Sequence, residues 1–288
     1  MRIEVNGVRL FVDVEGSGWV PDGPKLRQKP TLILLHGGPG ADHSIYKPEF
    51  SKFSDLAQIV YVDHRGNGHS EDGEPALWTL DQWADDLHAL IQTLGIEQPI
   101  LYGASFGGFV AQAFATKYPD TPGALILAAT SAKVDFEVIF DAFTRIGGAE
   151  AGSVARTYWS GPTPERRQAY FEHCLPHYSV STLDPDKIAR MLVKNPVAMH
   201  FNGPENEMGQ FDFRQALPRV TCPTLVLSGD RDPMMPVPFS DTIAASLTGA
   251  DVTHITLKNA GHMLEADQPE AFFDHIRSFI CTHMQEMS

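Results

Sequence analysis

Cysteine is scarce in this chain. Only Cys174, Cys222 and Cys281 occur among 288 residues. They are odd in number and lack the paired spacing of zinc sites, which excludes a disulfide framework and a cysteine-based metal site. Free thiols in a reducing compartment are the remaining interpretation, so we expect a cytoplasmic protein.

Basic residues and long apolar runs are also lacking. The chain has 22 Lys and Arg against 36 Asp and Glu, which gives a net charge of -14. Nucleic acids and anionic lipids attract proteins through basic patches, so neither is expected as a partner. No apolar stretch approaches the roughly 18 residues of a membrane helix, and the first ten residues alternate like a strand instead of a signal sequence.

Short apolar runs alternate with helical patterns through most of the chain. Residues 2–15 predict two strands joined by a tight turn at Asn6-Gly7, whereas 16–30 is rich in Gly, Pro and charge and is expected to be an exposed connection. Further strands are expected at 31–35, 59–62, 99–103, 124–130, 224–229 and 252–257, and helices at 80–94, 106–117, 238–247 and 268–285. This alternation predicts a doubly wound α/β fold with a mostly parallel sheet.

The alternation stops between about residues 133 and 212. Aromatic residues, Met and His are mixed there with helical stretches and Pro-rich turns. We interpret 133–212 as a helical cap inserted into an α/β core formed by residues 1–132 and 213–288.

Ser105 is the candidate nucleophile. It lies in Gly103-Ala104-Ser105-Phe106-Gly107, between a predicted strand and a predicted helix. In this context a G-x-S-x-G turn projects the serine hydroxyl, and the following helix N-terminus favours negative charge. A chance match to the motif is the alternative, and the strand-turn-helix context argues against it.

A second glycine-rich turn, His36-Gly37-Gly38-Pro39-Gly40, follows the first buried strand. It can direct backbone N–H groups at the nucleophile, so the N–H groups of Gly38 and Phe106 are the candidate oxyanion hole. A plain glycine-rich loop is the alternative. His36 is expected to support this loop and not to transfer protons.

A serine hydroxyl needs a base to remove its proton, and the base needs a third group to orient it. Among twelve histidines, His262 stands out because it follows the last predicted strand and precedes the final helix. The order nucleophile, acid, histidine also matches enzymes that have this elbow. Asp232 is the favoured acid. Asp230 is the alternative, and both aspartates follow the predicted strand at 224–229.

These motifs together resemble the α/β-hydrolase fold superfamily, and within it the prolyl aminopeptidase-like branch. The matching segments are HGGPG at 36–40, DHRGNGHS at 63–70, GASFGG at 103–108, PTLVLSGDRDPMMP at 223–236 and NAGHMLEADQPE at 259–270. The resemblance implies an eight-stranded sheet flanked by helices, and a triad of Ser105, Asp232 and His262. It also implies that Asp63 and Arg65 belong to a structural loop.

The chain departs from true prolyl aminopeptidases at the elbow and in the cap. The elbow of those enzymes resembles G-G-S-W-G, whereas this chain has Ala104 and Phe106 on either side of the serine. The resemblance also implies an acidic cap residue that holds the substrate's ammonium group. Glu205 or Glu207 in NGPENEMG is the candidate, and an ordinary solvated pair is the alternative.

The leading hypothesis is a serine hydrolase that acts through an acyl-enzyme on small carboxylic esters, without cofactor or metal. A prolyl aminopeptidase with the same triad comes second, and lactone or carbon–carbon bond hydrolysis third, since one fold hosts all of them. A non-catalytic ligand-binding protein is the alternative from another class. The expected partner is therefore a small-molecule ester or amide substrate.

Overall fold

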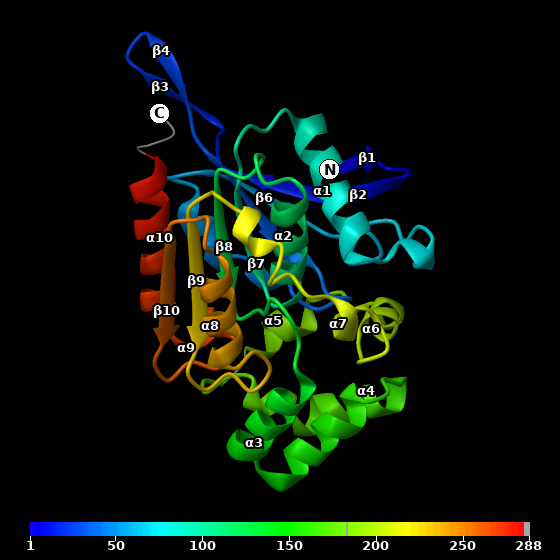
Figure 1. The fold of residues 1–288 in the computed structure, drawn as a ribbon. Coiled ribbons are helices and arrows are strands. Elements are labelled where there is room, and N and C mark those ends of the chain that lie inside the picture. Colours follow the sequence, from blue (N-terminus) through cyan, green and yellow to red (C-terminus); the bar gives the residue numbers. More distant parts are fainter. Residues whose placement is uncertain (183, 285–288) are drawn as a thin grey trace.

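An eight-stranded sheet with helices on both faces forms the body of the protein (Figure 1). The computed structural model describes residues 1–182 and 184–284. The strand order is β1-β2-β6-β5-β7-β8-β9-β10. Strand β2 runs antiparallel to β1 and β6, and the pairings from β6 through β10 are parallel. The predicted mostly parallel, eight-stranded α/β sheet is thus confirmed.

The strands lie where the apolar runs predicted them. They are β1 (Arg2–Val5), β2 (Val8–Glu15), β5 (Thr31–Leu35), β6 (Gln58–Val62), β7 (Ile100–Ala104), β8 (Ala124–Ala128), β9 (Thr224–Gly229) and β10 (Val252–Leu257). The side chains of β5, β8 and β9 are buried throughout, because helices cover both faces of the sheet. Strand β10 lies at the edge and is only partly buried.

The chain begins with the predicted hairpin and continues into a second one. Asn6 and Gly7 have φ values of 45° and 78°, as the tight turn requires. The segment 16–30, expected as an exposed connection, is exposed but also contains two strands, β3 (Trp19–Asp22) and β4 (Lys25–Gln28), which pair as a separate ribbon. Its side chains are mostly exposed, so no apolar alternation marked these strands in the sequence. The ribbon projects from the sheet in Figure 1.

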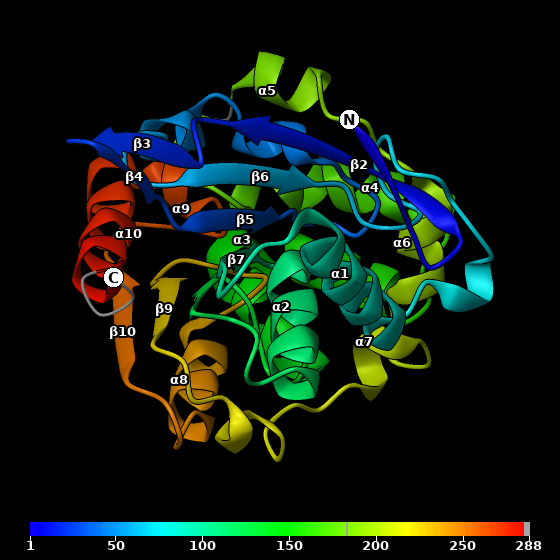
Figure 2. The same ribbon diagram turned by 90° about the horizontal axis from the view of Figure 1, so that it is seen from above.

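The helices predicted in the core are present. They are α1 (Leu80–Leu94), α2 (Phe106–Lys117), α8 (Val237–Ser246) and α10 (Pro269–Met284), the last preceded by the short α9 (Leu264–Asp267). The predicted end of the final helix at 285 lies outside the described residues. Figure 2 shows α1 and α2 on one side of the sheet and α10 on the other. Two apolar cores result, one on each face.

Helix α1 begins and ends at the residues that its sequence predicts. The hydroxyl of Thr79 accepts a hydrogen bond from the Gln82 N–H at 3.2 Å, and Gly95 ends the helix with a left-handed φ of 62°. The Gln82 side chain donates to Asp86 and not back to Thr79, so these two residues form only half of a capping box.

Between β8 and β9 the chain forms helices that lie beyond the carboxyl ends of the strands (Figure 1). They are α3 (Phe136–Trp159), α4 (Pro164–His173), α5 (Pro185–Ala189), α6 (Asn195–Phe201) and α7 (Glu207–Gln210). We call residues 133–212 the cap segment. The division of the chain into this cap and a core of 1–132 and 213–288 stays a prediction. Within the described residues, no helix has the length and apolar character needed to cross a membrane.

A buried ion pair joins the first hairpin, the loop after β6 and helix α1. Arg65 is 1% exposed. Its Nε and Nη2 donate to the two carboxylate oxygens of Asp86 at 2.7 Å each, and Nη2 also donates to the Asn6 carbonyl at 3.0 Å. Two parallel hydrogen bonds of this kind fix the relative orientation of the elements that carry them.

Replacing Asp86 with Ala should lower the free energy of unfolding by about 3–5 kcal/mol, because the buried guanidinium then lacks a counter-charge. Asp81→Ala on the same helix is the matched control, since its carboxylate is 76% exposed and pairs with Lys117 at the surface. That change should cost less than about 1 kcal/mol. Urea denaturation measures both, and equal losses would contradict a structural role for the buried pair.

Candidate functional site

Ser105 occupies a strained turn between β7 and α2. Its φ and ψ are 53° and −119°, a backbone conformation that few non-glycine residues adopt. The Ser105 N–H donates to the Ala128 carbonyl at 3.0 Å. The Ser105 carbonyl accepts from the Gly108 N–H at 2.9 Å and from the Thr130 hydroxyl at 2.8 Å. These bonds to the neighbouring strand and helix hold the turn in place.

The glycines of this turn are required by close backbone approach. A Cβ at Gly107 would overlap the Leu35 carbonyl oxygen at the end of β5, and one at Gly103 would overlap the Gly107 carbonyl. The first turn of α2 therefore rests directly on the adjacent strand. Any larger residue at these positions would shift the turn that carries Ser105.

His262 and Asp232 meet at the carboxyl ends of the last two strands. The distance from His262 Nδ1 to Asp232 Oδ2 is 2.8 Å, and the two side chains are 7% and 0% exposed. The other Asp232 oxygen accepts from the N–H groups of Met234 and Met235 at 2.7 and 2.8 Å. The carboxylate is thus held by hydrogen bonds on both oxygens, and one of them orients the imidazole.

Asp230, the alternative acid, has a different environment. Its side chain is 28% exposed, and its Oδ2 lies 3.9 Å from the Lys258 amino group. The structure brings Asp232, and not Asp230, into contact with His262.

Ser105 and His262 line the same cavity, whose volume is about 280 Å³. Gly38 also lines it and has a φ of 124°. Phe106 contributes the first N–H of α2, which has no acceptor within its own helix. Apolar side chains from the core and the cap segment form most of the cavity wall, namely Ile45, Phe109, Phe171, Leu175, Ile188, Met191, Val193, Phe201, Met208, Met234, Met235 and Met263.

His36 supports the loop that carries Gly38. It is fully buried, its Nδ1 lies 2.7 Å from the Gly37 carbonyl, and its Nε2 accepts from the His64 N–H at 3.2 Å. Burial lowers the pKa of His36. The imidazole is therefore neutral, with its proton on Nδ1, and both nitrogens bond to the backbone.

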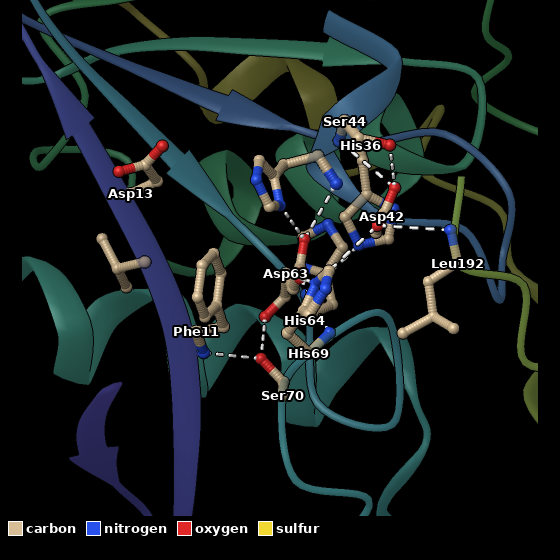
Figure 3. Close-up of polar contacts among 12 residues, drawn as sticks. Phe11, Asp13, His36, Asp42, Ser44, Asp63, His64, His69, Ser70 and Leu192 are labelled. Carbon is tan, nitrogen blue, oxygen red and sulfur yellow. Dashed lines mark hydrogen bonds and ion pairs between the residues drawn. The ribbon is translucent and has the colours of Figure 1, made fainter. Parts of the chain in front are cut away.

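Asp63 connects the loops that carry His43 and His69 through hydrogen bonds (Figure 3). One of its oxygens accepts from the N–H and from Nδ1 of His43 at 2.8 Å each. The other accepts from the N–H of His69 at 2.8 Å and from its Nδ1 at 3.1 Å. Burial alone would raise the pKa of Asp63, but the hydrogen bond from His43 and the neighbouring imidazoles hold it well below its usual value. The carboxylate is ionised and its bonding capacity is filled.

One group of side chains in the described part of the chain has the spacing of metal ligands. Asp42, His43 and His69 place one ligand-type atom each within 4.8 Å of one another. Nδ1 of both histidines faces the Asp63 carboxylate, which only accepts hydrogen bonds, so each Nδ1 carries a proton and bonds to Asp63 and not to a metal. Asp42 in turn accepts from Ser44 and from the Leu192 N–H of the cap segment (Figure 3). We therefore assign the cluster a structural role.

The two cap glutamates singled out in the sequence lie elsewhere. Glu205 is exposed. Glu207 accepts from the Leu80 N–H at 2.8 Å, at the start of α1, and burial raises its pKa. Neither is among the described residues that line the cavity with Ser105. Glu207 supports the N-terminus of a helix, a role that the NGPENEMG segment did not indicate.

Three charged or amide side chains of the cavity wall were missed in the sequence. They are Arg167 in α4, Asn202 directly after α6, and Glu265 in α9. Glu265 lies three positions after His262, so its proximity was available from the motif. The two cap residues lie in irregularly patterned sequence, and only the packing of the cap helices brings them to the cavity.

Asp267 links the loop that carries His262 to the cap segment. One carboxylate oxygen accepts from the Gly261 N–H at 2.7 Å. The other accepts from the N–H groups of Val180 and Ser181 at 3.0 and 2.8 Å, and from the Ser179 hydroxyl. Burial alone would raise the pKa of Asp267, but these hydrogen bonds lower it below its usual value.

Tyr178 reinforces the same connection. Its carbonyl accepts from the N–H groups of His262 and Met263 at 2.6 and 3.2 Å. Its ring packs edge-on against the imidazole, with centroids 5.0 Å apart. The position of His262 therefore depends on the cap segment as well as on Asp232.

Replacing Asp267 with Asn should lower the free energy of unfolding at pH 7 by about 1–3 kcal/mol, because an amide N–H₂ then faces backbone donors. The folded-state pKa of this carboxyl is depressed. The advantage of the wild type should therefore be present above the unfolded-state pKa of about 3.9 and be lost as the pH falls below it.

Urea denaturation between about pH 7 and pH 3 measures this difference. Asp274→Asn, the same change on the exposed face of α10, is the control and should cost less than about 0.5 kcal/mol. A wild-type advantage that does not change with pH would show that the Asp267 charge is not its source.

Comparison with known proteins identifies the family of the chain. Residues 32–275 match the Alpha/beta hydrolase family. Proline iminopeptidase PfmaB of Pestalotiopsis fici is 28% identical over 289 residues, covering 96% of this chain and 98% of that protein. A monoacylglycerol lipase of Mycolicibacterium smegmatis is 26% identical over 300 residues, covering 97% and 95%.

Solved structures give the same result for the fold. A thermophilic esterase from Thermogutta terrifontis superposes with a TM-score of 0.72 at 25% identity, covering 98% of this chain and 99% of that one. A proline iminopeptidase from Mycobacterium smegmatis superposes with a TM-score of 0.79 at 20% identity, covering 100% and 99%. The chain is therefore a hydrolase that belongs to the alpha/beta hydrolase family, and within that family it is similar in sequence to proline iminopeptidases.

Proposed function

We propose that this hydrolase is a serine esterase that cleaves small carboxylic esters through an acyl-enzyme. Ser105 is the nucleophile, His262 the general base and Asp232 the carboxylate that orients it. One observation carries the proposal. His262 forms a buried hydrogen bond of 2.8 Å with Asp232, and it lines the same cavity as Ser105.

The protonation of His262 follows from its partner. A carboxylate only accepts hydrogen bonds, so the proton of the neutral imidazole lies on Nδ1, and Nε2 keeps a free lone pair. Nε2 takes the proton of Ser105 as the serine oxygen bonds to the ester carbonyl carbon. The imidazolium then protonates the departing alkoxide, and the carbon–oxygen ester bond breaks.

The second half of the reaction uses the same groups. Nε2 removes a proton from water, whose oxygen attacks the acyl carbon. The proton returns to Ser105 as the acid product leaves. In both halves the carbonyl oxygen becomes negative, and the N–H groups of Gly38 and Phe106 are the proposed donors to it. The N-terminus of α2 adds its partial positive charge at the same place.

The cavity favours esters over amino-terminal peptides. Its wall is mostly apolar, and neither Glu205 nor Glu207 reaches it, so the acidic partner expected for a substrate ammonium is missing at those positions. An uncharged acyl chain fits such a surface without desolvation of a charge. The esterase and the monoacylglycerol lipase among the similar proteins act on this bond by name.

A prolyl aminopeptidase is the second candidate, because Glu265 lines the cavity. A carboxylate there is the group that a free ammonium would need. The Glu265 carboxylate, however, lies 3.4 Å from the Lys187 amino group, and its side chain is only 12% exposed. Its charge is already paired, which ranks ester cleavage first. Lactone and carbon–carbon bond hydrolysis use the same serine chemistry and come third.

Wild-type protein should hydrolyse p-nitrophenyl esters of short acids and cleave proline-β-naphthylamide poorly. Ser105→Ala should lose turnover by up to about a millionfold, as removal of such a nucleophile does elsewhere. A fluorophosphonate probe should label the wild type and leave the variant unlabelled. This reaction also separates the enzyme from a non-catalytic binding protein.

Two results would refute the assignment. Ester turnover above a few per cent in Ser105→Ala would exclude this nucleophile. Efficient cleavage of the prolyl amide, abolished by Glu265→Gln, would make the protein an aminopeptidase.

The acid is tested by paired amide substitutions. Asp232→Asn should lower kcat by about 10⁴-fold, because the amide cannot stabilise the imidazolium and can hold the wrong tautomer. Asp230→Asn is the matched control and should leave kcat unchanged, since that carboxylate points to Lys258. Steady-state kinetics on one p-nitrophenyl ester measures both. A larger loss in Asp230→Asn would reverse the assignment.

A further inference from the structure

The cap side of the cavity contains a group of polar atoms in an otherwise apolar wall. Tyr158 near the end of α3, Arg167 in α4 and Asn202 after α6 all line the cavity. All three come from the cap segment, opposite the loops that hold Ser105 and His262.

Asn202 is buried with part of its amide unpaired. The residue is 4% exposed, and its Nδ2 donates to the Tyr158 hydroxyl at 2.9 Å. Its Oδ1 has no hydrogen-bond partner among the described residues. Turning the amide over lets the Tyr158 hydroxyl donate to Oδ1 and leaves Nδ2 unpaired instead. In either orientation one buried polar atom lacks a partner, at a cost of about 1–3 kcal/mol. A ligand in the cavity would supply that partner.

Arg167 brings an uncompensated positive charge to the same region. Its guanidinium stacks on the Phe171 ring at 4.5 Å and donates to the Asn195 side chain. Within the described residues no carboxylate lies at ion-pair distance from it. Burial raises the pKa of the Tyr158 hydroxyl, while the hydrogen bond with Asn202 and the nearby charge of Arg167 lower it, so the three groups act on one another.

The other charged residue of the cavity wall already has an ionic partner, Lys187, which it shares with Glu49. Glu265 pairs with Lys187 at 3.4 Å, whereas Arg167 has no acid partner. The free charge in the cavity is therefore positive, although the whole chain carries -14. The charges of the outer surface are screened beyond about 8 Å at physiological salt, so the nearby guanidinium determines which ligands the cavity accepts.

We propose that Tyr158, Arg167 and Asn202 form a recognition site for a carboxylate, so that the substrate carries a second, anionic group besides the ester that is cleaved. This inference rests on the proposed esterase function. With the amide turned over, Nδ2 of Asn202 and the planar guanidinium both donate to a carboxylate, which accepts in the same plane. Half-esters of dicarboxylic acids have this chemistry. A substrate with a free ammonium would meet the positive charge of Arg167 instead.

The test compares esters of equal shape that differ in charge. p-Nitrophenyl hydrogen glutarate is paired with p-nitrophenyl 5-methylhexanoate, in which an isopropyl group replaces the carboxylate. 4-(Butanoyloxy)benzoate is paired with 4-isopropylphenyl butanoate, so that the acid lies on the alcohol half. The wild type should prefer the acid in at least one pair by about 10- to 100-fold in kcat/KM, the range expected for hydrogen bonds to a charged group.

The preference should depend on the cap residues. Arg167→Gln should reduce the ratio of the two kcat/KM values to near one, mainly through KM, and Asn202→Asp should invert it by repelling the acid. Arg166→Gln is the matched control, because this neighbouring arginine is exposed and donates to the Gly161 carbonyl. It should leave the ratio unchanged. No preference in either pair, or a preference that survives Arg167→Gln, would overturn the inference.

A binding measurement separates this inference from the proposed function. Calorimetry with Ser105→Ala protein and monomethyl glutarate needs no turnover. Binding that is lost on the additional change Arg167→Gln would support the carboxylate site even if no ester is cleaved by the wild type. Ester cleavage without such binding would leave the esterase proposal intact and refute the carboxylate site.

Discussion

The close contact between the first turn of α2 and the end of β5 is the constraint on which the site depends. The Gly107 backbone lies against the Leu35 carbonyl, with no room for a Cβ. This contact forces the chain to turn sharply after β7 and gives Ser105 its positive φ. It also sets the loop that begins at His36 beside the serine, so that one backbone approach brings the proposed nucleophile and Gly38 to the same cavity. The parallel strands supply the remaining groups, because their carboxyl ends meet at a common edge.

Sequence patterns predicted the parts of the molecule that obey local rules. Buried runs such as 31–35 and 124–128 can be read as strands because both faces of the sheet are covered. The Thr79 cap and Gly95 set the ends of α1 through bonds within a few residues. The elbow and the pairing of His262 with an aspartate were also predictable, since motif and strand order place them. The family resemblance favoured Asp232 over Asp230, and the structure adds the direction of each side chain.

The sequence was least informative where long-range contacts decide. Glu205 and Glu207 were candidates for a substrate ammonium, with a solvated pair as the alternative, and the Glu207 carboxylate instead accepts from the backbone at the start of α1. Arg167 and Asn202 lie 35 positions apart in the sequence, in segments whose pattern predicts no common target. They face one cavity because of how the cap helices fold on each other. Strands β3 and β4 were missed because their exposed side chains leave no apolar alternation.

The cap segment is bonded to the very loops that form the site. Besides the contacts of Tyr178 and of residues 179–181, the Lys194 N–H donates to the Gly40 carbonyl at 2.6 Å, next to the turn of Gly38. Moving the cap segment away would therefore break the hydrogen bonds that hold the backbone on either side of the cavity. The same hydrogen bonds therefore hold both the wall that encloses the cavity and the backbone that positions Gly38 and His262.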